Sequence, residues 1–227
     1  MRLPAFAAVL LGCLAAPVPG AVITSEAAMP SGAAVIDFAP FASLGGDGWL
    51  TGPGPVQVGA AAGRDVTWSS NSKFALLGNG SYGLLGNGDW GKARGGFAAV
   101  NGEPGAAITF TFHDGPVGAV GGFVNYGKGT AAAALVLAAL GSAGEILESV
   151  DVAQAAPVHT PHQTGGGAFR GLLRDANDIH AFRVSGAFGV LDNLTFATAV
   201  PEPATAAVAV AAGTALLLRR RKGRGTA

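Results

Sequence analysis

The sequence contains one cysteine, Cys13, among its 227 residues. No thiol is left beyond this position, so we expect no disulfide, no cysteine nucleophile and no zinc–thiolate site in the rest of the chain. Charged residues make up only 12% of the sequence and aromatic residues 7%. No stretch before the C-terminal tail has the pattern of a long amphipathic helix, which argues against a helical fold.

Basic residues are also scarce between the two ends of the chain. Residues 22–200 hold eight basic residues against thirteen acidic ones, a net charge of −5. Nucleic-acid binding needs a basic patch or stripe, so we expect no nucleic-acid partner. The motifs G-x-S-x-G, H-E-x-x-H and C-x-x-C do not occur in the sequence. We therefore expect a protein that is not an enzyme and that carries no cofactor, apart from the structural calcium considered below.

The N-terminus has the pattern of a signal peptide. A short basic start, Met1–Arg2, precedes a mostly apolar run from Leu3 to Leu14 and then small residues with helix breakers. This order predicts a signal peptide over residues 1–21, cleaved after Gly20. The alternative is lipoprotein processing, because the sequence Leu-Leu-Gly-Cys that ends at Cys13 resembles a bacterial lipobox.

The C-terminus, residues 200–227, has three ordered parts. The motif Pro201-Glu202-Pro203 is followed by the apolar run Ala204–Leu218 and then by a basic cluster. Fifteen helical residues span about 22 Å, so this helix is short for a membrane core of about 30 Å. Basic residues beyond a span favour a cytoplasmic C-terminus. The members of this cluster are Arg219, Arg220, Arg221 and Lys222.

This tail resembles the PEP-CTERM sorting signal. The resemblance implies an exported protein of a Gram-negative bacterium, anchored in the inner membrane until an exosortase-type enzyme processes it. It also implies a final place at the cell surface or in the extracellular matrix, with exopolysaccharide as a partner. The alternative is a plain C-terminal membrane anchor with an incidental Pro-Glu-Pro.

Residues 22–199 have the pattern of short strands separated by turns. Ile108, Phe110 and Phe112 alternate with threonines, and we interpret the alanine-rich run 131–140 as a buried strand that forms a hairpin with the residues after 144. This body resembles the β-sandwich modules that precede PEP-CTERM tails, through the segments 115–127, 169–184 and 188–196. The resemblance implies an all-β fold, a jelly-roll-like or galactose-binding-like antiparallel β-sandwich.

The most conspicuous motif is a tandem repeat, LLGNGSYG followed by LLGNGDWG, over residues 76–91. Each copy contains G-x-G-x-x-G, but no strand–helix unit surrounds it, so nucleotide binding is not expected. Instead, Asn79-Gly80 and Asn87-Gly88 predict tight turns. Tyr82 and Trp90 then either pack into the core or stack on a sugar ring as an exposed aromatic platform.

Asp192 is the acidic residue that most needs an explanation. Strict alternation places it on one face of a strand with the apolar residues on either side of it. A carboxylate in that position must turn outward at a bulge, accept backbone N–H groups from a neighbouring loop, or bind a metal. The metal would be a structural calcium ion, with Asp37 as a second oxygen donor.

Together, these features predict an exported surface protein that is structural or glycan-binding within exopolysaccharide. The alternative is a secreted carbohydrate-active enzyme. Glycosidases use two carboxylates held about 5–10 Å apart, and the sequence does not locate such a pair.

Overall fold

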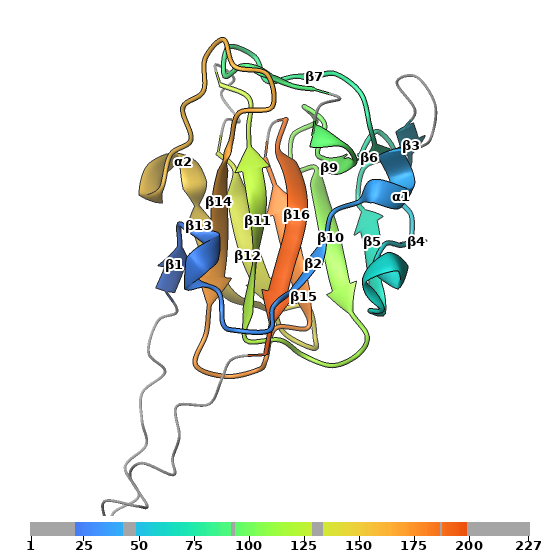
Figure 1. The fold of residues 1–227 in the computed structure, drawn as a ribbon, viewed down its shortest axis with the longest axis vertical. Coiled ribbons are helices and arrows are strands. Elements are labelled where there is room, and N and C mark those ends of the chain that lie inside the picture. Colours follow the sequence, from blue (N-terminus) through green and yellow to red (C-terminus); the bar gives the residue numbers. More distant parts are fainter. Residues whose placement is uncertain (1–20, 43–48, 92–93, 129–133, 187, 199–227) are drawn as a thin grey trace, which may run out of the picture.

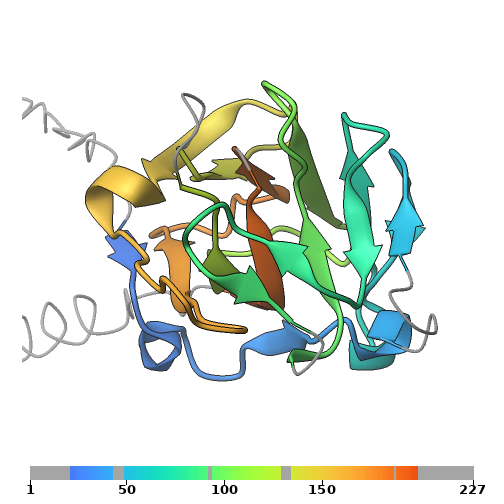
Figure 2. The same cartoon turned by 90° about the horizontal axis from the view of Figure 1, so that it is seen from above.

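Two antiparallel β-sheets packed face to face form the body of the protein (Figure 1). The computed structural model describes residues 21–42, 49–91, 94–128, 134–186 and 188–198. Figure 2 looks down on the sandwich along its long axis. The predicted fold class, an antiparallel β-sandwich, is confirmed.

The first sheet has eight strands. In spatial order they are β1 (Ala21–Ile23), β14 (Ala168–Leu173), β11 (Ala119–Asn125), β16 (Val190–Ala197), β9 (Phe97–Ala99), β6 (Leu76–Gly78) and β3 (Trp49–Thr51), with β2 (Ala34–Ile36) also paired to β16.

The second sheet has six strands, and a separate two-stranded hairpin lies outside both sheets. The six strands are β13 (Ile146–Asp151), β12 (Val136–Leu140), β15 (Ala181–Ser185), β10 (Ala107–Phe112), β5 (Val66–Ser70) and β4 (Val56–Gln57). The hairpin joins β7 (Tyr82–Gly83) to β8 (Asp89–Trp90). Short helical turns are α1 (Ala39–Ala42), α2 (Val152–Ala155), η1 (Glu26–Ala28) and η2 (Ala60–Ala62).

From β9 to β16 the chain changes sheets at every connection except the β12–β13 hairpin. Alternating apolar residues of both sheets therefore meet in one core, as Ile108, Phe110 and Phe112 do on β10. The strand predicted at 131–140 is confirmed over β12, and so is its hairpin with β13, while residues 131–133 lie outside the described part of the chain. The pairing of these strands shifts register after Ala139, and Ile146 is 56% exposed whereas Val150 is buried.

Both described ends of the chain leave the sandwich at the same end. Ala21 pairs with Leu173, Leu173 with Ala119, and Ala119 with Ala197, so Ala21 and Ala197 lie in one row. Three strand spacings separate them, about 14 Å. We call this the terminal end and the opposite one, where β11 ends at Asn125, the loop end.

The predicted signal peptide, with Cys13, and the predicted sorting tail fall outside the described residues. This holds for Pro201, Glu202 and Pro203 and for the basic cluster of Arg219, Arg220, Arg221 and Lys222. Among the residues that the structure describes, no helix is long and apolar enough to cross a membrane.

Candidate functional site

The tandem repeat covers the outer face of the eight-stranded sheet, opposite the main core. Leu84 and Trp90 pack there on Phe97 and Val190 in an outer cluster of buried side chains. Trp90 is fully buried, with its ring centroid 6.2 Å from that of Phe97. Of the two alternatives for Trp90, its burial supports packing into the protein, because a buried indole offers no face to a ligand.

Tyr82 lies beside this cluster and is half-buried. Its hydroxyl donates a hydrogen bond to the carbonyl oxygen of Val100 at 2.5 Å, and its ring lies near those of Phe97 and Phe188. Burial raises the pKa of Tyr82. Of the two predicted interpretations, packing describes both aromatic residues better than an exposed platform.

The turn in the second copy of the repeat lies two residues earlier than predicted. Leu85 and Gly86 have φ angles of 44° and 87°, and the N–H of Asn87 donates to the carbonyl of Leu84 at 2.9 Å. This is the pattern of a type I′ turn. Gly88 instead allows close packing, because a Cβ there would lie 2.4 Å from the carbonyl oxygen of Gln163.

Asn87 is the centre of a buried polar network at the loop end, which the sequence analysis missed. Its Nδ2 donates to the Oδ1 of Asn125 at 2.7 Å and to the carbonyls of Tyr126 and Val158. Its Oδ1 accepts the N–H of Thr160 at 3.0 Å. The signal that could have revealed this network is Asn125, a polar residue at the end of an apolar strand. The network holds three loops together and leaves its members little freedom to bind a ligand.

Asp192 lies in a bulge of β16. Its strand pairing with β11 is irregular between Gly121 and Phe123, and Asn193 has a φ of 50°. The bulge therefore occurs where it was predicted, but it does not turn the carboxylate out, since the Asp192 side chain is 3% exposed. Instead it moves Leu194 to the main core, so the strict alternation predicted for this strand is wrong.

The buried carboxylate of Asp192 is paired with a guanidinium. Arg94 Nη2 lies 3.2 Å from Asp192 Oδ2, and the backbone N–H of Asn193 donates to Oδ1 at 2.7 Å. Burial raises the pKa of Asp192 to about 6, against the opposing effect of Arg94. The guanidinium carbon of Arg94 lies 3.8 Å from the ring centroid of Phe123 and 4.8 Å from that of Trp90. The ion pair thus closes the outer cluster.

The hypothesis of calcium at Asp192 and Asp37 gains no support from these contacts. Arg94 provides the positive charge beside the Asp192 carboxylate, and Asp37 is exposed and accepts the N–H of Ala39 at 3.0 Å. Within the described ranges, no three or more His, Cys, Asp or Glu side chains are grouped so as to hold a metal.

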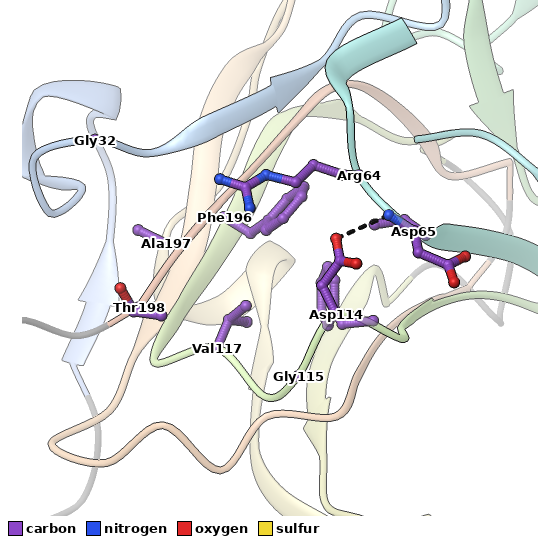
Figure 3. A pocket seen from close by; sticks show the side chains of 11 residues that line it. Gly32, Arg64, Asp65, Asp114, Gly115, Val117, Phe196, Ala197 and Thr198 are labelled. Carbon is purple, nitrogen blue, oxygen red and sulfur yellow. Dashed lines mark hydrogen bonds between the residues drawn. The ribbon is translucent and has the colours of Figure 1, made fainter. Parts of the chain in front are cut away.

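A small cleft opens between the two sheets at the terminal end (Figure 3). We call it the end cleft. Its floor includes Phe112, the last residue of β10, and Phe196 of β16, whose ring centroids lie 4.9 Å apart. Its rim carries Arg64, Asp65 and Asp114. None of these residues stands out in the sequence as a site, because they come from three separate segments.

Two hydrogen bonds of aspartate side chains fix the rim of the end cleft. The Oδ2 of Asp114 accepts the N–H of Asp65 at 2.9 Å, the contact drawn in Figure 3. The Oδ1 of Asp65 accepts the Nε2 of Gln57 at 2.7 Å. Arg64 is exposed beside them, after Gly63 ends η2 in the left-handed region. The cleft therefore offers hydrogen-bond acceptors and a cationic donor around an aromatic floor.

Comparison with known proteins finds partial structural matches. No protein-family model matches this chain, and no curated protein matches its sequence. A histidine mutant of the lectin-binding domain of lectinolysin, complexed with Lewis b, is 18% identical with a TM-score of 0.30, over 45% of this chain and 72% of that one. The tandem CBM51 modules of a family 98 glycoside hydrolase from Streptococcus pneumoniae are 13% identical with a TM-score of 0.32, over 66% of this chain and 45% of that one. Both TM-scores are below 0.5, so the fold class rests on the strand order described above.

Proposed function

We propose that this protein is an exported β-sandwich that binds glycan through the end cleft, in the exopolysaccharide at the cell surface. The observation that carries the proposal is the charged rim of Arg64, Asp65 and Asp114 around one small concavity. Sugar hydroxyl groups hydrogen-bond to charged and polar side chains of this kind. Asp65 and Asp114 would accept hydroxyl protons, and Arg64 would donate to ring or hydroxyl oxygens.

The export part of the proposal rests on the sequence. Pro201-Glu202-Pro203 would direct processing by an exosortase-type enzyme, and the basic cluster from Arg219 to Lys222 would keep the C-terminus in the cytoplasm before that step. Thr198, which lines the end cleft, comes three residues before Pro201. A tethered protein would therefore present its terminal end toward the membrane and its loop end outward.

Binding can be tested on the full-length chain in detergent, with the producing organism's own exopolysaccharide as the bait. We expect Arg64→Ala to weaken retention roughly tenfold, as the loss of a charge-assisted hydrogen bond would. Lys73→Ala is the matched control, because Lys73 is an exposed cation that follows Ser70, whereas Val66 at the other end of β5 lines the cleft. Equal retention of both variants and the parent chain would refute the end cleft as the glycan site.

Sorting can be tested separately by changing Pro201, Glu202 and Pro203 to alanine. We expect the full-length protein to remain in the inner membrane, where cell fractionation would find it. Unchanged processing in the native host would refute the sorting signal and leave the plain anchor.

A second candidate function is glycoside hydrolysis, and one observation favours it. Two carboxylates, Asp65 and Asp114, line the same cleft. Enzymatic use of this pair would show as release of reducing ends from the exopolysaccharide, lost in Asp114→Asn. Retention of the glycan without cleavage would favour the binding function.

A further inference from the structure

A second concave surface lies on the outer face of the six-stranded sheet, toward the loop end. We call it the sheet groove. In the row of paired residues that crosses this face, Arg183 stands between Thr109 and Ala138, with Ser69 beyond Thr109. The neighbours are short side chains, so Arg183 is the only long one in this row from Ser69 to Ala138.

The sheet groove has a defined shape and size. It measures about 410 Å³, within the range of about 300–1,000 Å³ that is usual for ligand sites. Asn71 fixes its upper rim, because its Nδ2 donates to the carbonyl of Gly105 at 2.9 Å and its Oδ1 accepts the N–H of Ala107 at 2.8 Å. The residues that line the groove are Asn71, Gly105, Ala107, Thr109, Arg183 and Ser185.

Arg183 differs from the other half-buried arginines. Arg94 pairs with Asp192, Arg174 with Asp178, and Arg170 donates to three backbone carbonyls. Across the described ranges, the guanidinium of Arg183 makes no hydrogen bond or ion pair, although the residue is half-buried. A guanidinium with five N–H donors that makes no contact of this kind is suited to an external oxyanion.

We propose that the sheet groove binds the carboxylate of an acidic saccharide unit, with Arg183 as its partner. The planar guanidinium matches a carboxylate with two parallel hydrogen bonds. Thr109, the neighbour of Arg183 on β10, and Ser185, two residues along β15, would meet the sugar's hydroxyl groups, and the short side chains around them admit a ring. Residues 22–200 carry a net charge of −5, so Arg183 is a positively charged group on a domain that is acidic overall. The site is separate from the end cleft and does not rest on it.

Calorimetric titration of the full-length chain in detergent with a galacturonate hexamer tests the proposal. We expect saturable binding that weakens roughly tenfold in Arg183→Ala and less in Arg183→Lys, which keeps the charge but loses the planar fork. The fully methyl-esterified hexamer, which has the same rings without the charge, should bind roughly tenfold more weakly than the acid. Lys128→Ala, which removes a cation that lines neither the end cleft nor the sheet groove, should leave the titration unchanged.

Three results would overturn this assignment. The first is hexamer binding that Arg183→Ala leaves intact at equal thermal stability, and the second is equal affinity for the acid and the ester. The third is absence of binding at millimolar hexamer. A sulfated neutral oligosaccharide that binds better than the galacturonate hexamer would replace the carboxylate with a sulfate as the recognised group. Loss of exopolysaccharide retention in Arg64→Ala alone would concern the end cleft and not the sheet groove.

Discussion

The two copies of the repeat, Leu76–Gly83 and Leu84–Gly91, share their first five residues and have different structures. In the first copy these residues begin as strand β6, and Leu77 is fully buried in the main core. In the second copy they form a turn, and the equivalent Leu85 is 46% exposed. The asparagines differ in the same way, since Asn79 is half-buried and Asn87 is completely buried.

This difference shows that tertiary contacts, not the repeated residues, select the local structure. The first copy is held by its strand β6, which pairs with β3 on one side and with β9 on the other. The second copy has no sheet neighbour of that kind and is held by side chains, through the network of Asn87 and the burial of Trp90. Changing one support in one copy and the equivalent residue in the other copy would therefore have different effects.

The largest effect should come from Trp90, which anchors the second copy. Trp90→Ala would leave a cavity in the outer cluster, and such changes cost about 3–5 kcal/mol. Tyr82→Phe, at the equivalent position of the first copy, removes one hydrogen bond and should cost about 1 kcal/mol. Urea unfolding of both variants measures the difference. Similar losses in the two variants would mean that the outer cluster does not hold the second copy in place.

The next effect concerns the asparagines. Asn87→Ala removes a side chain whose buried partners include the N–H of Thr160 and the carbonyls of Tyr126 and Val158. Leaving these groups unpaired should lower the free energy of unfolding by about 3 kcal/mol. The loss in unfolding free energy should be smaller for Asn79→Ala than for Asn87→Ala by at least about 1 kcal/mol, because Asn79 is only half-buried. Amide hydrogen exchange of residues 156–166 would report the loosened loop. Equal losses from the two changes would contradict the network's role.

Much of this architecture could be predicted from the sequence. The alternation of apolar residues and threonines predicted β10 and its buried face. The alanine-rich run was interpreted as a strand although alanine favours helices, because a glycine turn and a second strand follow it. Strand β12 confirms this interpretation over Val136–Leu140. Alternation failed at Asp192 because one inserted residue in a bulge reverses the faces of a strand.

The candidate sites were much harder to predict. The end cleft joins Arg64, Asp114 and Phe196, and the sheet groove joins Asn71 and Arg183, which are more than a hundred positions apart in the sequence. The pairing of strands decides these neighbours, and no local pattern encodes it. The turn at Leu85 was missed for a related reason, since Asn-Gly is the stronger turn signal and tertiary contacts of Asn87 overrode it.

A smaller effect should come from pH, through the ion pair that closes over Trp90. The pKa of Asp192 is about 6 in the folded protein and 3.8 is its usual value, so the folded state holds the proton more tightly. The free energy of unfolding should therefore fall by roughly 2 kcal/mol as pH rises from about 4 to about 6, and should then level off. Asp192→Asn should lose this component, and the difference between the two pH profiles isolates it. Parallel profiles would contradict the burial of the carboxylate.

The smallest effect should be a gain in stability at the turn of the second copy. Leu85 is exposed and has a φ of 44°, a region that costs a leucine but suits asparagine. Leu85→Asn creates Asn-Gly at the two central positions of a type I′ turn and should stabilise the protein by about 0.5–1 kcal/mol. The same change at Leu77, which is buried in the main core, should destabilise it by several kcal/mol, on the order of 3. Thermal unfolding of the pair gives both signs. A loss of stability in Leu85→Asn would mean that the exposed leucine makes contacts worth more than the backbone strain it carries.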